Sequence, residues 1–124
     1  MKKIKIKSGD VEVEAILNDT KTAESIWNKL PITGRVNTWG DEIYFSIPVK
    51  IEAENPKAVV DLGDLGYWRE GSAFCIFFGE TPISRKGEIR PASAVNIFGK
   101  VDLNRINEFK KIKDGDKIEV LKVE

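Results

Sequence analysis

The feature that most constrains this fold is a run of six apolar residues at positions 73–78, three of which are phenylalanine. A strand with one face in water would carry polar residues at alternate positions, and this run has none. It is also shorter than an ordinary buried helix, and Gly71 and Gly79 stand on either side of it. The run therefore predicts a central strand that is buried on both faces.

Half-buried strands are predicted around this central one, because apolar and polar residues alternate in several segments. Segments 4–6 and 11–17 alternate on either side of a Ser-Gly-Asp turn, which predicts a hairpin. The lysines of its first strand are typical of an edge strand with one wet face. Alternation returns at 43–49 after a Trp-Gly-Asp turn. Further strands are expected near 34–38, 94–101 and 117–123.

Two short helices and two irregular stretches complete the pattern. Residues 18–20 offer capping side chains to a helix that Pro31 ends, and Asp102 offers one to a second helix. The glycine-rich stretch 63–66 and the loop 80–92 are expected to be irregular. About eight short strands with two short capping helices are typical of a closed β-barrel. The sequence therefore predicts one mainly β domain that comprises residues 1–124.

Charge and hydropathy limit the classes of partner. Lys plus Arg and Asp plus Glu number 20 each, so the formal net charge is zero. No global field then favours nucleic acid or an acidic membrane. No apolar run approaches the length of a membrane span, and the lysine-rich start is followed by no apolar signal segment. We therefore expect a cytoplasmic protein with neither a nucleic-acid nor a membrane partner.

Missing residue types exclude several chemistries. The chain has no His and no Gln, so Ser-His-Asp catalysis, Cys-His catalysis and His-based zinc sites are excluded. Cys75 is the single cysteine, so no internal disulfide forms, and its Phe neighbours predict a buried small hydrophobe. Asp61, Asp64 and Glu42 match no known cation-binding loop, and we expect no metal and no cofactor. The many Lys and Glu indicate a thermophilic source.

Several short motifs resemble those of the cyclophilins. IFGKV at 97–101 precedes a predicted helix and IKDGD, and GSAF at 71–74 is similar to the start of a cyclophilin central strand. Over nearly the whole chain, the similarity is to small prokaryotic atypical cyclophilin-like proteins. Their hallmark stretches are found here as VNTWGDEIYF, GDLGYW, FFGETP and PASAVN. The resemblance implies a cyclophilin barrel with helices at its ends, and no settled biochemical function.

The same resemblance implies that the usual isomerase residues are missing. Val95 and Arg90 stand where cyclophilins carry a pocket His and a pocket Trp, and Ala73 and Cys75 replace a Gln and a Phe of the central strand. The stretch 43–49 has no Arg where the catalytic Arg is expected. Prolyl isomerisation requires an apolar slot and a cationic donor that favours the twisted amide. Efficient isomerase activity is therefore not expected.

A candidate ligand groove lies beside the central strand. Trp39, Glu42 and Tyr44 combine aromatic faces with a hydrogen-bonding group, which suits a pocket for a peptide or small molecule. Alternatively, Trp39 plugs one end of the barrel and its polar neighbours bond the turn backbone. Arg69 and Arg90 are either cationic donors or surface loop residues. The candidate groove residues are Asn37, Trp39, Glu42, Tyr44, Tyr67, Trp68, Phe74, Thr81, Pro82, Arg90 and Pro91.

Several functions are compatible with these residues. The leading hypothesis is a cyclophilin-like binding module for a peptide or small ligand, without efficient prolyl isomerase activity. The alternatives are a weak or atypical peptidyl-prolyl cis-trans isomerase, an amide-handling enzyme with Glu42 as base, and a protein-interaction subunit. The catalytic residues and the oligomeric state stay open. These hypotheses rest on analogy of fold.

Overall fold

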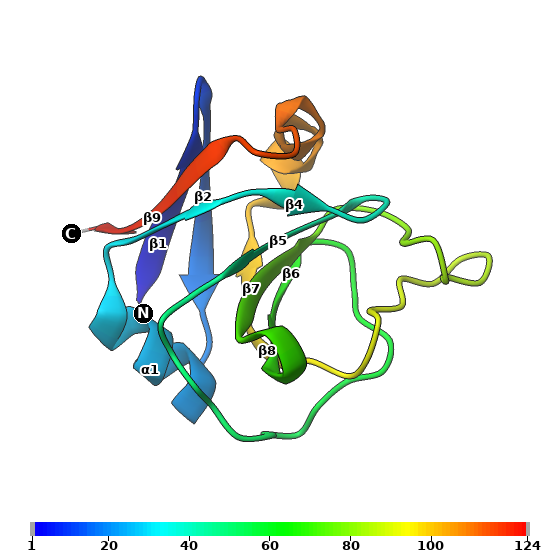
Figure 1. Cartoon of the computed structure of the whole chain (residues 1–124), viewed down its shortest axis with the longest axis horizontal. Coiled ribbons are helices and arrows are strands. Elements are labelled where there is room, and N and C mark those ends of the chain that lie inside the picture. The colour runs from blue at the N-terminus through cyan, green and yellow to red at the C-terminus, as the bar shows by residue number, and fades with distance from the viewer. Residues whose placement is uncertain (1, 124) are drawn as a thin grey trace.

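A single antiparallel sheet of nine strands organises the molecule (Figure 1). The computed structural model describes residues 2–123, so Met1 and Glu124, the ends of the predicted domain, lie outside it. The strands follow one another across the sheet in the order β3-β9-β1-β2-β8-β6-β7-β5-β4. Their bounds are β1 Lys3–Ser8, β2 Val11–Leu17, β3 Ile32–Arg35, β4 Asn37–Thr38, β5 Glu42–Ser46, β6 Asp64–Trp68, β7 Ala73–Phe77, β8 Asn96–Val101 and β9 Lys117–Val123.

The two ends of this sheet are consecutive segments of the chain. β3 pairs with β9 and β4 pairs with β5, and only Val36 separates β3 from β4. Because β3 and β4 follow each other along one extended stretch, they cannot pair with each other. They are therefore the first and the last strand of the hydrogen-bonded sheet. The predicted mainly β class is confirmed, whereas the predicted closed barrel is not: within residues 2–123, no ladder joins the first strand of the order to the last.

The central strand has the predicted burial on both faces. All five residues of β7 are buried, and the strand lies between β6 and β5 in the interior of the sheet. Phe74 and Ile76 enter the main hydrophobic core. Cys75 and Phe77 face the other side, in a second cluster with Val60, Ala73, Ile89 and Val95. The run is apolar without alternation because its two faces pack into two separate hydrophobic clusters.

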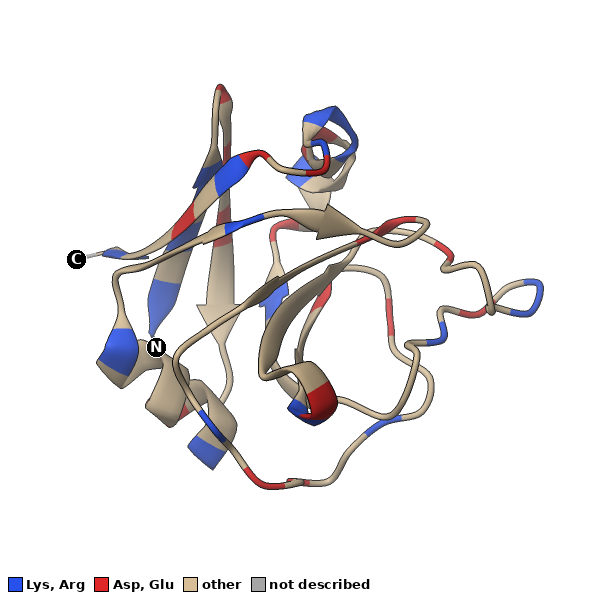
Figure 2. Ribbon diagram, in the orientation of Figure 1, with Lys and Arg blue, Asp and Glu red and all other residues tan. Residues whose placement is uncertain are grey.

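The first hairpin forms as predicted, but its first strand is not an edge. β1 pairs with β2 through Ser8↔Val11, and on its other side it pairs with β9. The lysines of β1 alternate with buried residues, and Lys5 and Glu12 approach to 3.4 Å across the hairpin. Figure 2 marks the basic positions of β1 in blue and the acidic positions of β2 in red. Alternation with lysine indicates only that one face of the strand is in water. Interior strands of an antiparallel sheet also have such a face, so the pattern does not identify an edge strand.

The stretch 63–66 was predicted to be irregular, and this is wrong for all but its first residue. Gly63 lies in a turn at φ 86°, whereas residues 64–66 begin β6, which pairs with both β7 and β8 and has a register shift between Leu65 and Gly66. Gly66 is required here by packing: a Cβ at this position would lie 2.7 Å from Val95 Cγ2 and 3.1 Å from Phe77 Cε2. Gly66 therefore marks a close approach between strand and covering loop, and not a turn.

Both predicted helices form. In Figure 1 the first lies below the strands of the sheet and the second near the top of the view. α1, Lys21–Lys29, begins after Thr20, whose side chain accepts the Ala23 N–H, and ends before Pro31. The 3₁₀ helix η2, Leu103–Lys111, begins after Asp102, whose side chain accepts the Asn104 N–H. A further 3₁₀ turn, η1, spans Arg69–Gly71. None of the helices within residues 2–123 is long and apolar enough to cross a membrane.

Two irregular segments, 47–63 and 78–95, cover the second cluster. They are tied to each other by the bridges Lys57↔Val95 and Val60↔Ile89. In Figure 1 they run beside β6 and β7 as the green and yellow-green loops. This covering layer and the sheet beneath it frame the candidate site.

Candidate functional site

Three side chains of the candidate set share the face of the sheet that lies opposite the main core. Because neighbouring residues of a strand point to opposite faces, Ile43 and Phe45 enter the main core while Glu42 and Tyr44 face outward. Tyr44 pairs in register with Cys75, and Trp68 with Ala73. Glu42, Tyr44 and Trp68 therefore meet on the outer face of β5, β7 and β6.

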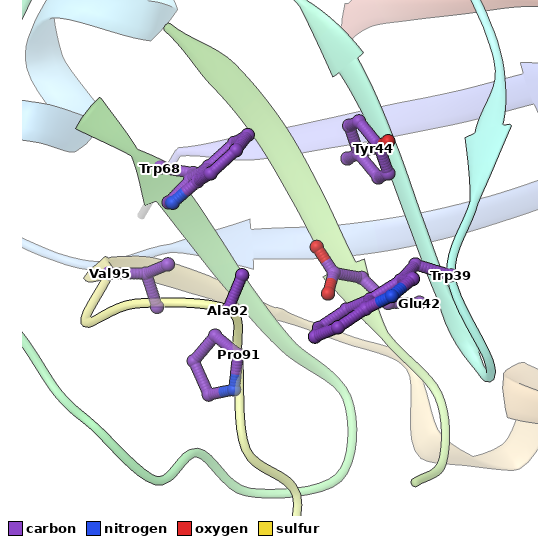
Figure 3. A pocket seen from close by; sticks show the side chains of 7 residues that line it. All are labelled: Trp39, Glu42, Tyr44, Trp68, Pro91, Ala92 and Val95. Carbon is purple, nitrogen blue, oxygen red and sulfur yellow. The ribbon is translucent and has the colours of Figure 1, made fainter. Parts of the chain in front are cut away.

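These side chains line a cavity of about 290 Å³. Segment 78–95, called the covering segment from here on, closes one side of the cavity, as Figure 3 shows. The Glu42 carboxyl is directed into the space between the Trp39 and Trp68 rings, with Pro91 and Ala92 opposite. The lining residues are Trp39, Glu42, Tyr44, Trp68, Pro91, Ala92 and Val95.

Trp39 is positioned by a tight turn that is anchored to the end of the central strand. Its N–H donates to Glu42 O at 2.9 Å, which closes the turn between β4 and β5. The Asp41 N–H donates to Glu80 O, and the Phe78 N–H donates to Asp41 O. Gly40, at φ 61°, sits so close to Glu80 that a Cβ would lie 2.8 Å from its carbonyl oxygen. Backbone contacts thus hold the indole at the rim.

Trp68 connects the sheet to the covering segment. Its Nε1–H donates to Ser93 Oγ at 2.7 Å, and Ser93 Oγ donates to Glu70 Oε2 at 3.0 Å. The rings of Trp68 and Tyr44 meet edge to face, with centroids 6.2 Å apart. Because the indole N–H is already satisfied by Ser93, Trp68 offers the cavity apolar and π surface.

Glu42 is the one carboxyl that lines this cavity. It is only 6% exposed, and within residues 2–123 it forms no ion pair within 4 Å. Burial raises its pKa to about 7, and a hydrogen bond with the Cys75 thiol acts in the opposite direction. Near neutral pH the carboxyl is therefore present in both protonation states, which is the condition for a proton-transfer group or a charge-sensing contact.

The Cys75 thiol is next to the Glu42 carboxyl and is expected to be unreactive. The thiol is fully buried, as predicted, and its pKa is raised well above the ordinary value, first by burial and then by the negative charge of Glu42. A thiol that stays protonated is a poor nucleophile. Within the described chain, no cluster of three or more carboxylates or thiols is placed to hold a metal ion.

Three members of the candidate set support the covering segment instead of lining the cavity. The Thr81 hydroxyl donates to Arg90 O, and the Thr81 N–H donates to Ser84 Oγ at 3.0 Å. The Arg90 guanidinium pairs with Glu88 through a 2.7 Å contact. Pro82 is exposed beside Thr81. These contacts fix the shape of residues 81–91.

Three other members of the set do not line the cavity either. Tyr67 points into the main core, and its hydroxyl donates to Val49 O at 2.8 Å. Phe74 is fully buried between Phe45 and Phe98, each 5.0 Å away between ring centroids. Asn37 is exposed and donates to Tyr44 O at 3.4 Å. Tyr67 and Phe74 are adjacent to outward-facing residues, so they belong to the inner face.

Two lining residues, Ala92 and Val95, were missing from the candidate set. Val95 is the position that the resemblance aligns with the pocket His of cyclophilins, which was the one signal in the sequence for its place in the cavity. Ala92 lies one residue after Pro91 and carried no chemical signal of its own.

Fold and cavity together define a mainly β domain with a small aromatic and acidic pocket beside its central strand. The Cyclophilin-like family profile matches residues 2–121, and the chain therefore belongs to the Cyclophilin-like family. The predicted membership is confirmed. No curated protein matches the chain at a significant level.

Solved structures with a similar fold include an archaeal protein and McbB. The solution structure of the hypothetical protein AF2241 from Archaeoglobus fulgidus is similar with a TM-score of 0.81 and 41% identity, over 98% of this chain and 95% of that one. The structure of McbB in complex with tryptophan is similar with a TM-score of 0.74 and 15% identity, over 95% of this chain but 44% of that one. The second likeness concerns the fold alone.

Proposed function

We propose that this domain is a binding module for a small ligand or a short peptide segment, and that its binding site is the cavity between Trp39 and Trp68. The observation that carries the proposal is the combination of three aromatic side chains with one buried carboxyl in one cavity. Ligand sites are typically concave and apolar, with few polar groups that fix orientation. A pocket closed by Pro91 and Val95 has that character.

Efficient prolyl isomerase activity does not fit this cavity. A cationic donor is needed beside the twisted amide, but among residues 2–123 no Arg or Lys lines the pocket. Arg69 is exposed and pairs with Glu52 at 3.2 Å, and Arg90 pairs with Glu88. The polar group that the cavity does offer is a carboxyl, which has the opposite charge. A weak isomerase that uses a displaced arginine is the alternative.

A protease-coupled assay on X-Pro tetrapeptides, with an ordinary cyclophilin alongside, tests the negative part of the proposal. We expect rates equal to the uncatalysed isomerisation. Turnover above that background that is lost in Arg69→Gln or Arg90→Gln would establish the isomerase alternative.

Tryptophan fluorescence tests the positive part, because two of the three tryptophans line the cavity. The third, Trp27, lies on α1 with Lys122 Nζ 4.8 Å from its ring, so Trp27→Phe removes a background signal from outside the site. Titration with an N-acetylated proline amide should change the emission with saturation. Indole and L-tryptophan are themselves fluorescent, so their titrations are followed by NMR and should saturate likewise. Tryptophan is included because McbB is solved with it. If no compound of this panel saturates the signal, and the same holds for the cations considered below, the binding proposal fails.

A further inference from the structure

The cavity holds an acidic group that has no counter-charge in the protein. Glu42 is almost fully buried, and within the described residues no cation lies within 4 Å of its carboxyl. Its carboxyl group points into the cavity (Figure 3). A buried carboxylate without a counter-charge destabilises the folded state, even where a neutral thiol bonds to it. A charge complement that arrives from outside the protein would offset that cost.

The other walls favour a cation of a particular kind. Trp39, Tyr44 and Trp68 contribute aromatic rings, whose negative faces attract ammonium groups. Pro91, Ala92 and Val95 contribute apolar contact suited to alkyl groups. A strongly hydrated metal ion would gain little from such walls, whereas an alkylated ammonium carries positive charge and apolar surface on the same atoms.

We propose that this pocket recognises an organic ammonium group, enclosed by the rings of Trp39, Tyr44 and Trp68 and paired with the Glu42 carboxylate. The inference rests on the proposed binding function and names the chemical class of its ligand. A cavity of about 290 Å³ is at the small end of ligand sites, so it accommodates one head group. Anionic ligands are disfavoured because they would face Glu42 in a poorly solvated site.

Binding of an ammonium group would be coupled to the ionisation of Glu42. Since burial raises the pKa of this carboxyl to about 7, a bound cation favours the ionised form, and affinity rises between pH 6 and pH 8. The other titratable groups that face it are Tyr44 on β5 and Cys75 on β7, and the lining residues of the covering segment have none. The pKa of the Cys75 thiol is raised, so it stays neutral across this range.

The decisive experiment compares choline with 3,3-dimethyl-1-butanol, which has the same shape but a carbon in place of the charged nitrogen. Affinities are measured by fluorescence or NMR titration at pH 8 in the Trp27→Phe background. We expect choline to bind at least about tenfold more tightly than the neutral alcohol. Glu42→Gln should abolish this preference, so that choline and the alcohol bind the variant with equal affinity. Trp39→Leu should lower the affinity for choline more than the affinity for the alcohol.

The outcomes separate this inference from the proposed function. Equal affinity for both compounds overturns the ammonium inference but leaves a small-ligand site in place. Binding of neither compound also overturns it, and indole and the N-acetylated proline amide, which carry no ammonium group, then test the proposed function independently. A cooperative urea-unfolding transition of Glu42→Gln shows that the variant is folded.

A third arm distinguishes two sources of the same head group. An acetylated tripeptide amide with a central trimethyllysine is compared with choline. Tighter binding of the peptide identifies a protein side chain as the source, and equal or weaker binding identifies a free small amine.

Discussion

At the scale of single residues, Glu42 is the side chain that departs furthest from ordinary behaviour. It follows a turn, begins β5, and by alternation must face away from the main core. The covering segment then encloses it among aromatic and apolar groups, which costs the charged form much of its hydration. Burial therefore favours the protonated carboxyl, and the folded protein keeps this proton up to a higher pH than the unfolded chain does.

This residue predicts a pH dependence of stability. The folded pKa of about 7 lies above the ordinary value of 4.5, so the native state binds more protons between these values and stability falls as pH rises through them. A shift of this size corresponds to about 3 kcal/mol of unfolding free energy. Glu42→Gln removes the titration, so the variant should match the wild type near pH 3.5, below the ordinary pKa, and exceed its stability by up to that amount at pH 8. Urea unfolding of both proteins at the two pH values measures the difference, and parallel pH profiles would contradict it.

At the scale of elements, α1 is held by contacts that come from far along the chain. Its N-terminal N–H groups are satisfied locally by Thr20 and at long range by Glu54, whose carboxylate accepts from the Lys21 and Thr22 N–H groups at 3.0 and 2.9 Å. The Asn96 side chain accepts the Glu54 N–H at 2.9 Å. Segment 47–63 is thus fastened to both the helix and β8.

We expect Glu54→Ala to destabilise the protein by about 1–2 kcal/mol at pH 7, since two helix amides and the Thr22 hydroxyl lose a charged acceptor. Hydrogen bonds from Thr22 and Lys21 lower the pKa of Glu54, so this stabilisation is present above the unfolded pKa and is lost as pH falls through the folded one. The gap between variant and wild type should therefore close in acid. Denaturant unfolding across pH 2.5–7 measures it.

Glu52→Ala is the matched control. The Glu52 side chain is 89% exposed and meets only Arg69, also exposed, at 3.2 Å. Surface pairs of this kind contribute little, so a change within about 0.5 kcal/mol is expected. A loss as large as that of Glu54→Ala would show that the loop as a whole, and not the helix cap, is responsible.

At the scale of the whole molecule, the sheet separates two apolar clusters that share β7. Phe74 and Ile76 belong to the main core, and Cys75 and Phe77 to the cluster under the covering segments. The cavity therefore depends on the outer layer, while the sheet depends mainly on the inner core. Whether the outer layer opens separately from the sheet is a measurable property.

The single buried thiol reports on that question. Cys75 lies in the central strand at 1% exposure with a raised pKa, so a thiol reagent should label the native chain at least about a thousandfold more slowly than the unfolded chain. If labelling needs global unfolding, the denaturant dependence of the protection should equal the equilibrium m-value. Protection that is nearly independent of denaturant would instead mean that residues 47–63 and 78–95 open by themselves.

The sequence by itself determined the central strand, the first hairpin, both helices and the family. Each rests on local signals: an apolar run without alternation, alternation around a turn, a capping side chain with a proline stop, and motifs at short spacing. β9 was predicted within its bounds of Lys117–Val123. Such signals depend on neighbouring residues alone, and tertiary contacts here agree with them.

The tertiary structure alone decided which side chains meet in the cavity. Tyr67 and Trp68 are adjacent aromatics, and in a strand buried on both faces the alternation has two equivalent phases, so composition does not tell which one faces the pocket. Pairing with β7 places Tyr67 opposite Phe74 in the main core and Trp68 outside it. The same holds for Gly66: it pairs with Ile97 of β8, and Val95, which is distant along the chain, packs so closely that no Cβ fits there. The pocket exists because segments that are distant along the chain meet there, and that meeting also leaves Glu42 buried without a counter-charge.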